Sequence, residues 1–356
     1  MFLQSKESSV IFLGAGASAP FGYPPTKPFV ETLMQRIPET EDRGKLLRSI
    51  RETQGVEDAE HITQVLDVVD ALKTTPLRRF LENSGLNFQR FSNLRYGNFE
   101  SIAMSLREQV RTEIFRTYSW KPEFQPKLDL YGQLFPLFHG AVLDVFTTNY
   151  DRVIEEYCKA EPSIRLENGF VADEKRRVWE WNPTVSYEAS SGNQRLLRLY
   201  KLHGSLNWRS TIQGAIEEVR PEERIGIGGE ASYAENLLIY PGGKAEPTSE
   251  PFYSLYRAFD QKIRDATSCL VIGFSFRDEY LNRGFSEFIG RMNTKLVVVS
   301  PSAAKNLEEN LLAGSSTPLQ SYRKKKRIVT IDKPFDKPSI QDVEQSFKAS
   351  GPENED

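Results

Sequence analysis

The sequence predicts an α/β protein with a doubly wound parallel sheet and a helical insertion. Short apolar runs recur along the chain, and each stops abruptly at glycine or polar residues, as strands do when both faces of a parallel sheet are covered. Segments of helical periodicity separate these runs, and such alternation is typical of strands joined by crossover helices. A turn of small residues follows the first run, where folds of this class commonly hold a phosphate group.

The first predicted strand, Val10 to Leu13, leads into five small residues, Gly14, Ala15, Gly16, Ala17 and Ser18. Small side chains would let backbone amides approach a ligand closely. A helix beginning a few residues later would present its N-terminal amides and dipole to a phosphate. The prolines between Pro20 and Pro28 predict an ordered loop over that ligand. A tight turn without a ligand is the alternative, because the motif is short.

Residues 29–137 are charged and predict a helical insertion packed on the sheet. Two stretches have apolar residues every three or four positions, namely residues 57–73 and a stripe formed by Phe99, Ile102, Leu106, Val110 and Ile114. Plain core packing explains both stripes. We therefore interpret the chain as a single domain, residues 1–356, in which residues 1–28 and 138–340 form a Rossmann-like core around the insertion.

The second predicted strand, Val142 to Phe146, ends in the polar run Thr147, Thr148, Asn149, Tyr150 and Asp151. Open α/β sheets bind ligands at the carboxyl ends of their strands. Asp151 is also suited to cap the helix predicted from Arg152 to Lys159, and Asn149 is suited to a turn. The residue types alone leave both a ligand-binding and a structural role open here.

A third, half-buried strand is predicted at Leu197 to Leu202, directly before His203. A histidine at a strand end is a good candidate for proton transfer, because its ordinary pKa lies near neutrality. His61, in a helical stripe, and His139, at a predicted helix end, are interpreted as structural. Residues 206–236 are loop-like, and periodicity is uninformative over residues 160–195.

The C-terminal part continues the same alternation. Further strands are predicted at Leu237 to Pro241, Cys269 to Phe276, Lys295 to Val299 and Ile328 to Ile331, with a helix whose apolar face carries Phe252, Leu255, Phe259 and Ile263. Small or polar residues again occur where two of these strands end, at Gly273 and Ser275 and at Ser300. The basic run from Arg323 to Arg327 is interpreted as a solvated face, with a partner contact as the alternative.

The composition argues against several classes of protein. Of 356 residues, 46 are Lys or Arg and 49 are Asp or Glu, so the formal charge of −3 provides no general attraction for nucleic acid. Cys158 and Cys269 are the two cysteines, which argues against a thiolate zinc ribbon and a disulfide framework. No apolar run is long enough to cross a membrane, and the N-terminus lacks a secretory pattern. We expect a soluble, cytoplasmic protein.

Four strand-end motifs now occur in order: Gly14 to Ser18, Thr148 to Asp151, Lys201 to Gly204, and Gly273 to Ser275. This ordered set, from Val10 to Phe335, resembles the sirtuin family, which holds NAD in an α/β domain through the same four motifs. The resemblance implies the pyrophosphate at the first glycine loop, and the ribose and nicotinamide at Thr148, Asn149 and Asp151. It implies His203 as the catalytic base, and Gly273, Ser275 and Ser300 along the adenosine.

Three departures separate this chain from sirtuin deacylases. Residues 206–236 contain none of the four cysteines of the deacylase zinc module, the Phe-Arg expected after Gly22-Tyr23-Pro24 is absent, and Thr148 replaces a glutamine. The chain therefore looks like the sirtuin-like NAD hydrolases of bacterial anti-phage defence, in which helices replace the zinc module. That resemblance implies no bound metal, a homo-oligomer, and in some systems a hexameric FtsK/HerA-type ATPase partner.

The implied reaction is hydrolysis of the nicotinamide–ribose bond of NAD, with NAD as substrate. Breaking a glycosidic bond builds oxocarbenium character at the ribose, so the site must fix the sugar and place a water. Histidine suits the base, and a neutral asparagine amide suits orientation rather than proton transfer. Two alternatives stay open: a sirtuin-type protein deacylase or ADP-ribosyltransferase, and a non-catalytic sensor of NAD or ADP-ribose.

Overall fold

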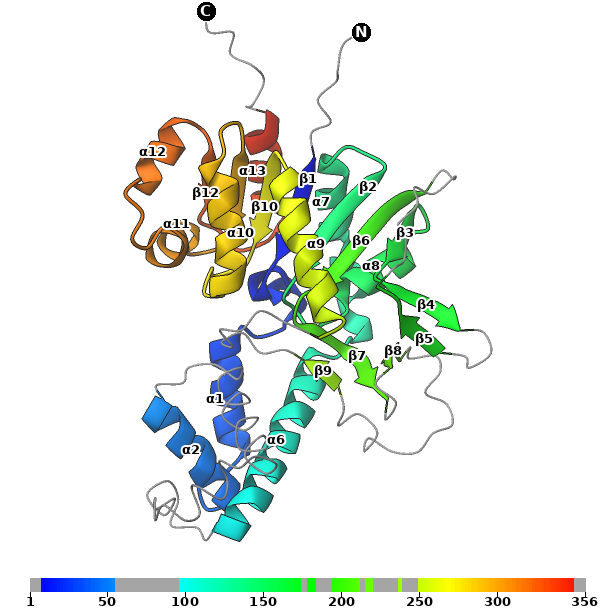
Figure 1. The fold of residues 1–356 in the computed structure, drawn as a ribbon, viewed down its shortest axis with the longest axis vertical. Coiled ribbons are helices and arrows are strands. Elements are labelled where there is room, and N and C mark those ends of the chain that lie inside the picture. Colours follow the sequence, from blue (N-terminus) through cyan, green and yellow to red (C-terminus); the bar gives the residue numbers. More distant parts are fainter. Residues whose placement is uncertain are drawn as a thin grey trace, which may run out of the picture. The chain divides into compact units, whose positions relative to one another are not determined.

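The computed structural model describes residues 8–54, 96–173, 178–183, 194–211, 215–219, 236–238 and 249–348. These residues form two compact units, which divide between residues 23 and 24 and between residues 119 and 120 (Figure 1). The segment 120–137, predicted from the sequence to lie in the insertion, packs in the same unit as the sheet. The helix expected at residues 57–73, with His61, lies outside the described residues.

The first unit is built on a seven-stranded sheet in which every pairing is parallel. Its strands, in spatial order, are β12 (Ile328–Ile331), β11 (Lys295–Val299), β10 (Ser268–Ile272), β1 (Ser9–Leu13), β2 (Val142–Thr147), β6 (Arg195–Lys201) and β3 (Ile164–Glu167). This order confirms the predicted doubly wound α/β fold. The chain moves outward from β1 on one side and later returns to β10 on the other, so the β1/β10 junction is the topological switch point, where such sheets bind ligands.

Helices cover both faces of this sheet (Figure 1). They are η4 (Pro122–Leu128), α7 (Asp129–Leu134), η5 (Phe135–Leu137), α8 (Val153–Ala160), α9 (Phe252–Asp265), α10 (Glu279–Gly290), α11 (Ala303–Asn306), η8 (Leu307–Leu311), α12 (Leu319–Lys324) and α13 (Lys337–Lys348). On one face, Phe12 of β1 packs on Phe259 of α9 and Phe285 of α10, with ring centroids 5.8 and 5.2 Å away. On the other, Tyr131 of α7 contacts Tyr157 of α8 at 6.2 Å. Because helices cover both faces of the sheet, the sequences of its strands are continuous apolar runs.

The glycine turn differs from its predicted form. Two 3₁₀ turns, η1 (Ala15–Ala17) and η2 (Ala19–Phe21), follow β1 in place of the expected α-helix. The next α-helix, α1 (Thr26–Arg36), begins among the prolines and belongs to the second unit. Pro28 is tolerated in its first turn, because amides there have no helical acceptor.

A second sheet was not predicted. It is antiparallel, with the order β4 (Phe170–Asp173), β5 (Val178–Trp181), β8 (Ile216–Glu218), β7 (Gly204–Ser210) and β9 (Asn236–Leu238). The interpretation of residues 206–236 as loop-like is therefore wrong for β7 and β8. Glu217 and Glu218 are buried, so the strands lack the apolar alternation that would have identified them.

The second unit contains α1, α2 (Asp42–Gln54) and α6 (Tyr96–Tyr118). The predicted stripe of α6 is confirmed at Leu106, Val110 and Ile114, which are buried, whereas Ile102 is half-buried. Glu113 of the same helix forms ion pairs with Arg36 and with Arg116. Packing of apolar stripes, supplemented by ion pairs, accounts for this helical unit.

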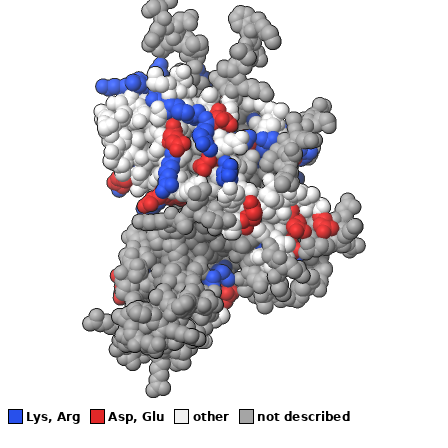
Figure 2. All heavy atoms as spheres, in the orientation of Figure 1, with Lys and Arg blue, Asp and Glu red and all other residues white. Residues whose placement is uncertain are grey.

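Charge on the first unit is mixed. Figure 2 shows acidic and basic side chains side by side on the face that carries α9 and α10, without a patch of a single sign. Within the basic run, Arg327 donates to the carbonyl oxygens of Ile289 and Arg291 near the end of α10, and Arg323 lies 3.9 Å from Asp332. No helix among the described residues is long and apolar enough to span a membrane.

Candidate functional site

The four strand-end motifs meet at the carboxyl edge of the parallel sheet. Leu13 pairs with Thr147 on one side and with Ile272 on the other, and Thr147 pairs with Lys201. The loops after β1, β2, β6 and β10 therefore begin side by side, because neighbouring strands lie about 4.8 Å apart. Asn149 and His203 each follow one of the paired residues Thr147 and Lys201 by two positions. The sheet thus brings the two predicted catalytic residues onto adjacent loops.

The glycine loop packs directly against the loop after β10. The Gly14 amide donates to the Ile272 carbonyl at 2.8 Å, and the Gly16 amide donates to the Gly273 carbonyl at 3.0 Å. A Cβ on Gly16 would lie 2.6 Å from the Gly273 Cα, and Gly273 itself has a φ of +66°. The structure therefore requires glycine at these positions for contact between two loops. Their contact with a pyrophosphate stays a prediction.

Asn149 is held by the glycine loop. Its Nδ2 donates to the Gly14 carbonyl and to the Ser18 hydroxyl, both at 2.9 Å, while its backbone amide donates to the Thr147 hydroxyl at 3.0 Å. The Gly14 carbonyl can only accept, so the amide orientation follows from its partner. Both Nδ2 hydrogens are used, which leaves the Oδ1 of this half-buried side chain as the end that can accept from a ligand.

Asp151 connects the glycine loop to the start of helix α8 through its two carboxylate oxygens. Its Oδ2 accepts from the Ser18 hydroxyl at 2.6 Å, and its Oδ1 accepts from the Val153 amide at 3.0 Å. Arg152 holds the N-cap position of α8, so Asp151 lies one residue before the predicted cap, although it still binds the first amide of the helix. Burial raises the pKa of this carboxyl, although Lys201, Ser18 and the Val153 amide act in the opposite direction. Both carboxylate oxygens are thus engaged inside the protein.

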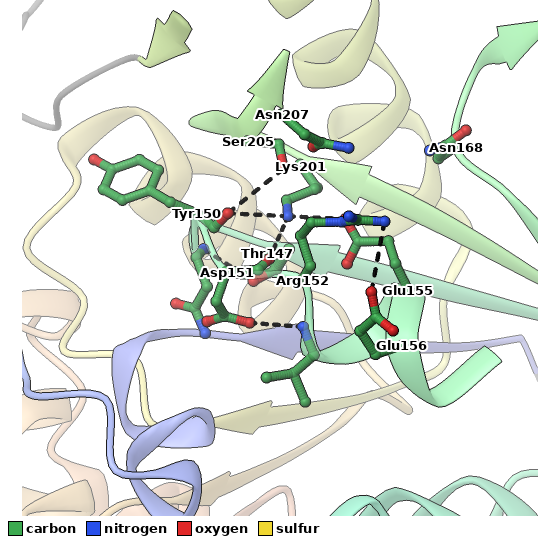
Figure 3. Close-up of polar contacts among 12 residues, drawn as sticks. Thr147, Tyr150, Asp151, Arg152, Glu155, Glu156, Asn168, Lys201, Ser205 and Asn207 are labelled. Atoms are coloured by element: carbon green, nitrogen blue, oxygen red, sulfur yellow. Dashed lines mark hydrogen bonds and ion pairs between the residues drawn. The ribbon is translucent and has the colours of Figure 1, made fainter. Parts of the chain in front are cut away.

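Lys201 is a residue that the sequence did not single out by itself. Its side chain is 1% exposed, and its amine donates to the carbonyl oxygens of Asp151 and Tyr150 (3.3 Å for the latter) and lies 3.0 Å from Glu155 Oε1. Figure 3 shows the amine between the Tyr150–Asp151 loop and helix α8. A lysine among the apolar residues at the end of a strand is the signal that could have identified it.

His203 lies at the joint between the two sheets, where Gly204 has a φ of +86° and turns the chain from β6 into β7. The imidazole is buried, and its Nε2 lies 3.3 Å from Asp278 Oδ2. Its Nδ1 has no hydrogen-bond partner among the described residues. Buried polar atoms usually have a hydrogen-bond partner, so this nitrogen is a candidate for contact with a ligand.

Asp278 is a second residue of the site that was not predicted from the sequence. It is the N-cap of α10, and its Oδ1 accepts from the Leu281 amide at 3.1 Å. Burial alone would raise the pKa of this carboxyl, but the hydrogen bond of His203, the charge of that ring when it is protonated, and the Leu281 and Tyr280 amides outweigh burial and lower the pKa. An aspartate directly before an apolar helical run signals a cap, yet nothing local indicates the histidine.

The other predicted ligand-binding residues lie along the same edge. Ala15 is exposed, and the Ala17 carbonyl accepts from the Tyr131 hydroxyl at 3.3 Å. The Thr148 amide donates to the Leu13 carbonyl, Ser275 follows β10, and Ser300 follows β11. These residues lie near one another along this edge, and their roles stay predictions. His139, which was interpreted as structural, is exposed and follows η5, before the amino end of β2.

The two cysteines lie apart in the fold. Cys158 is on α8 and Cys269 is on β10, and both are buried and unpaired. Burial raises the pKa of both thiols, so neither is activated as a nucleophile. Within the described ranges, no three His, Cys, Asp or Glu side chains are grouped as metal ligands would be.

Comparison with known proteins gives one family match. The model of a family described as "SIR2-like domain" matches residues 144–331, more than half of the chain. A solved Sir2 homologue in complex with NAD aligns with a TM-score of 0.43 and 12% identity, covering 97% of this chain and 91% of its own. Sir2Tm bound to a propionylated peptide aligns with a TM-score of 0.36 and 12% identity, covering 96% and 94%. No curated protein matches the sequence.

Proposed function

The chain belongs to the SIR2-like domain family, and from that premise we propose that it is an NAD+ glycohydrolase that releases nicotinamide and ADP-ribose. The observation that carries the proposal is the pair of free acceptors on adjacent loops. The Nδ1 of His203 and the Oδ1 of Asn149 are the ends of those side chains that receive no hydrogen bond from the described residues. A site that orients a sugar and accepts a proton from water needs such a pair.

In the proposed reaction, the bond between ribose C1′ and the nicotinamide nitrogen breaks, and its electron pair leaves with neutral nicotinamide. Water adds to C1′, and His203 accepts the proton that the water loses. Asn149 Oδ1 accepts a hydrogen bond from a ribose hydroxyl or from that water. Asn149 cannot titrate, and its amide is fixed on Gly14 and Ser18, so it orients without exchanging a proton.

We assign the pyrophosphate to the exposed tip of the glycine loop. The amides of Gly14, Gly16, Ala17 and Ser18 all donate inside the protein. Of the five loop residues Gly14 to Ser18, Ala15 alone has an amide without an acceptor among the described residues, and Ala15 is exposed. Thr148 and Asp151 are assigned to the nicotinamide side, and Gly273, Ser275 and Ser300 to the adenosine side.

Two other functions are weighed against this one. A deacylase or ADP-ribosyltransferase would use the same NAD site, but the four zinc-module cysteines and the Phe-Arg after Pro24 are absent from the sequence. A non-catalytic NAD or ADP-ribose sensor would not require an imidazole nitrogen without a partner beside the site. We therefore place hydrolysis first.

The biological role we propose is NAD depletion in the cytoplasm during anti-phage defence. A constitutively active NAD hydrolase would kill its own cell, so its activity must be controlled. We propose control through assembly, either as a homo-oligomer or with a hexameric FtsK/HerA-type ATPase. The mixed charge on the visible face of Figure 2 provides no reason to invoke direct nucleic-acid binding.

The test is nicotinamide release from NAD by the full chain, with and without an acetylated peptide. His203→Ala should lower turnover by about 10²–10⁴-fold while NAD affinity stays within a few-fold, because it removes proton transfer and not the phosphate contacts. Asn149→Ala should lower turnover with some loss of affinity. His139→Ala is the matched control, because His139 is an exposed histidine of the same unit.

Release that requires the peptide would favour the transferase instead. If the wild-type chain released no nicotinamide and the variants changed only the affinity for NAD, the sensor would be favoured. Wild-type turnover in a folded His203→Ala protein would refute the mechanism.

A further inference from the structure

We propose that Asp278 is the positioning residue for His203, holding the imidazole as the Nε2–H tautomer so that Nδ1 is the free base. The catalytic effect of this pairing rests on the proposed glycohydrolase function, since a base is needed only if the site transfers a proton. The hydrogen bond between Asp278 and His203 does not depend on that function and has its own measurement.

The direction of the hydrogen bond follows from what Asp278 can do. Its Oδ1 already accepts from the Leu281 amide at 3.1 Å, which orients the carboxylate at the start of α10. The other oxygen, Oδ2, faces His203 Nε2 at 3.3 Å. An ionised carboxylate only accepts, so Nε2 must carry the hydrogen. The lowered pKa of Asp278 is consistent with the ionised form.

The state of Nδ1 follows from burial. The His203 side chain is 2% exposed, and Nδ1 has no partner among the described residues. A second N–H at that position would make a buried, charged donor without an acceptor, which costs much more than a lone pair without a donor. When the ring is neutral, as a proton acceptor must be, its hydrogen is therefore on Nε2 and its lone pair is on Nδ1. This lone pair is suited to accept the proton of a bound water or hydroxyl.

A purely structural role for Asp278 makes a different prediction. If Asp278 served only to cap α10, Asp278→Asn would change little, because asparagine caps helices about as well as aspartate. In that variant the amide oxygen must stay on the Leu281 amide, so the NH₂ of the new side chain would face His203. A donor at this place favours a lone pair on Nε2 and moves the hydrogen to Nδ1. One substitution therefore keeps the cap and reverses the tautomer.

The experiment measures the tautomer directly by ¹⁵N NMR of histidine-labelled full-length protein. The chain has three histidines, so the set of signals that disappears in His203→Ala is assigned to His203. We expect wild-type His203 to be neutral, with the hydrogen on Nε2, and Asp278→Asn to show it on Nδ1. An imidazolium at neutral pH, or an Nδ1–H ring in the wild-type protein, would overturn the proposal whether or not the Asp278 variant folds.

Asp336→Asn is the matched control. Asp336 Oδ1 accepts from the Ser339 amide at 2.9 Å at the start of α13, so the same substitution is made at a helix start without a histidine partner. This control should leave both the His203 signals and the kinetics unchanged. A change in the His203 tautomer in Asp336→Asn would show that the NMR effect is indirect, and would overturn the assignment.

Kinetics then connect the tautomer to the reaction. Asp278→Asn should lower kcat for nicotinamide release at least about 100-fold, with KM within a few-fold, because it disables the base and leaves the binding contacts in place. Wild-type kcat in Asp278→Asn with a reversed tautomer would overturn the positioning role. If the wild-type chain released no nicotinamide, the glycohydrolase function would fail, while the tautomer measurement would still decide the pairing.

Discussion

Lys201 and Glu155 show how strongly single residues determine the geometry of this site. The two side chains are 1% and 6% exposed, and the lysine also donates to the carbonyls of Tyr150 and Asp151. A buried charge left without its partner is destabilising, whereas an apolar replacement of both is often tolerated. Lys201 therefore acts as a clamp between the loop that presents Asn149 and the start of α8.

Replacing this lysine tests the clamp. Lys201→Met should lower the free energy of unfolding by about 3–5 kcal/mol, because it leaves Glu155 buried without a cation. Adding Glu155→Leu should recover part of that loss, so the two changes should be non-additive in denaturant titrations. Lys305→Met is the control, because its partner Glu309 is 61% exposed, and it should cause a much smaller change. Additive effects at positions 201 and 155 would contradict the clamp.

At the scale of elements, the contact between the loops after β1 and β10 is the critical joint. Gly14 and Gly16 donate to carbonyls of the β10 end, and the backbones approach so closely that a Cβ on either glycine would lie 2.6 Å from atoms of Gly273. Backbone cannot move aside as a flexible side chain can. The switch point of the sheet is therefore held by glycines on both of its loops.

Gly16→Ala tests this joint with a single methyl group. We expect a loss of at least about 1–3 kcal/mol of stability, as for other overpacked sites, together with weaker NAD binding, because the two loops must separate. Gly290→Ala is the control, since a Cβ there meets no atom within 4 Å and alanine favours the helix of α10. Differential scanning calorimetry and NAD titration on both variants are the measurements. An unchanged melting temperature in Gly16→Ala would contradict the contact.

For the whole molecule, three strands of the second sheet, β7, β8 and β9, lie after the histidine motif, where deacylases carry their zinc module, and they pair with β4 and β5 from before it. Trp208 of β7 packs on Phe170 of β4 with ring centroids 5.0 Å apart, so aromatic packing supports this sheet. Asn168 and Asn207 both donate to Glu218 Oε1, at 3.0 and 3.1 Å. Aromatic contacts and buried hydrogen bonds provide a stabilisation that does not depend on thiolates.

Metal removal tests that conclusion. The only cysteines in the sequence, Cys158 and Cys269, are buried on separate elements of the sheet unit. A structural zinc site needs four clustered ligands, usually thiolates or imidazoles. We therefore expect dialysis against EDTA to leave both the melting temperature and nicotinamide release unchanged. Stoichiometric zinc by mass spectrometry, with a lower melting temperature after chelation, would contradict this expectation.

Much of the parallel sheet could be predicted from local pattern. Runs such as Val10 to Leu13 and Leu296 to Val299 are apolar throughout because helices cover both faces, and each ends where the chain reaches the ligand-binding edge. β10 ends at Ile272, earlier than predicted, because Gly273 turns the chain with a positive φ. The second sheet could not be predicted, since buried glutamates interrupt the alternation that identifies strands.

The α/β class, the order of the strand-end motifs and the choice of Asn149 and His203 as candidates all followed from the sequence alone, because each depends on residues close together in the chain. What those residues touch depends on the tertiary structure. Asp278 lies 75 residues from His203, Lys201 lies 46 from Glu155, and Ser18 lies 133 from Asp151. Hydrogen bonds and steric contacts act over a few ångströms in space, so pairings across such separations exist only once the parallel strands have aligned.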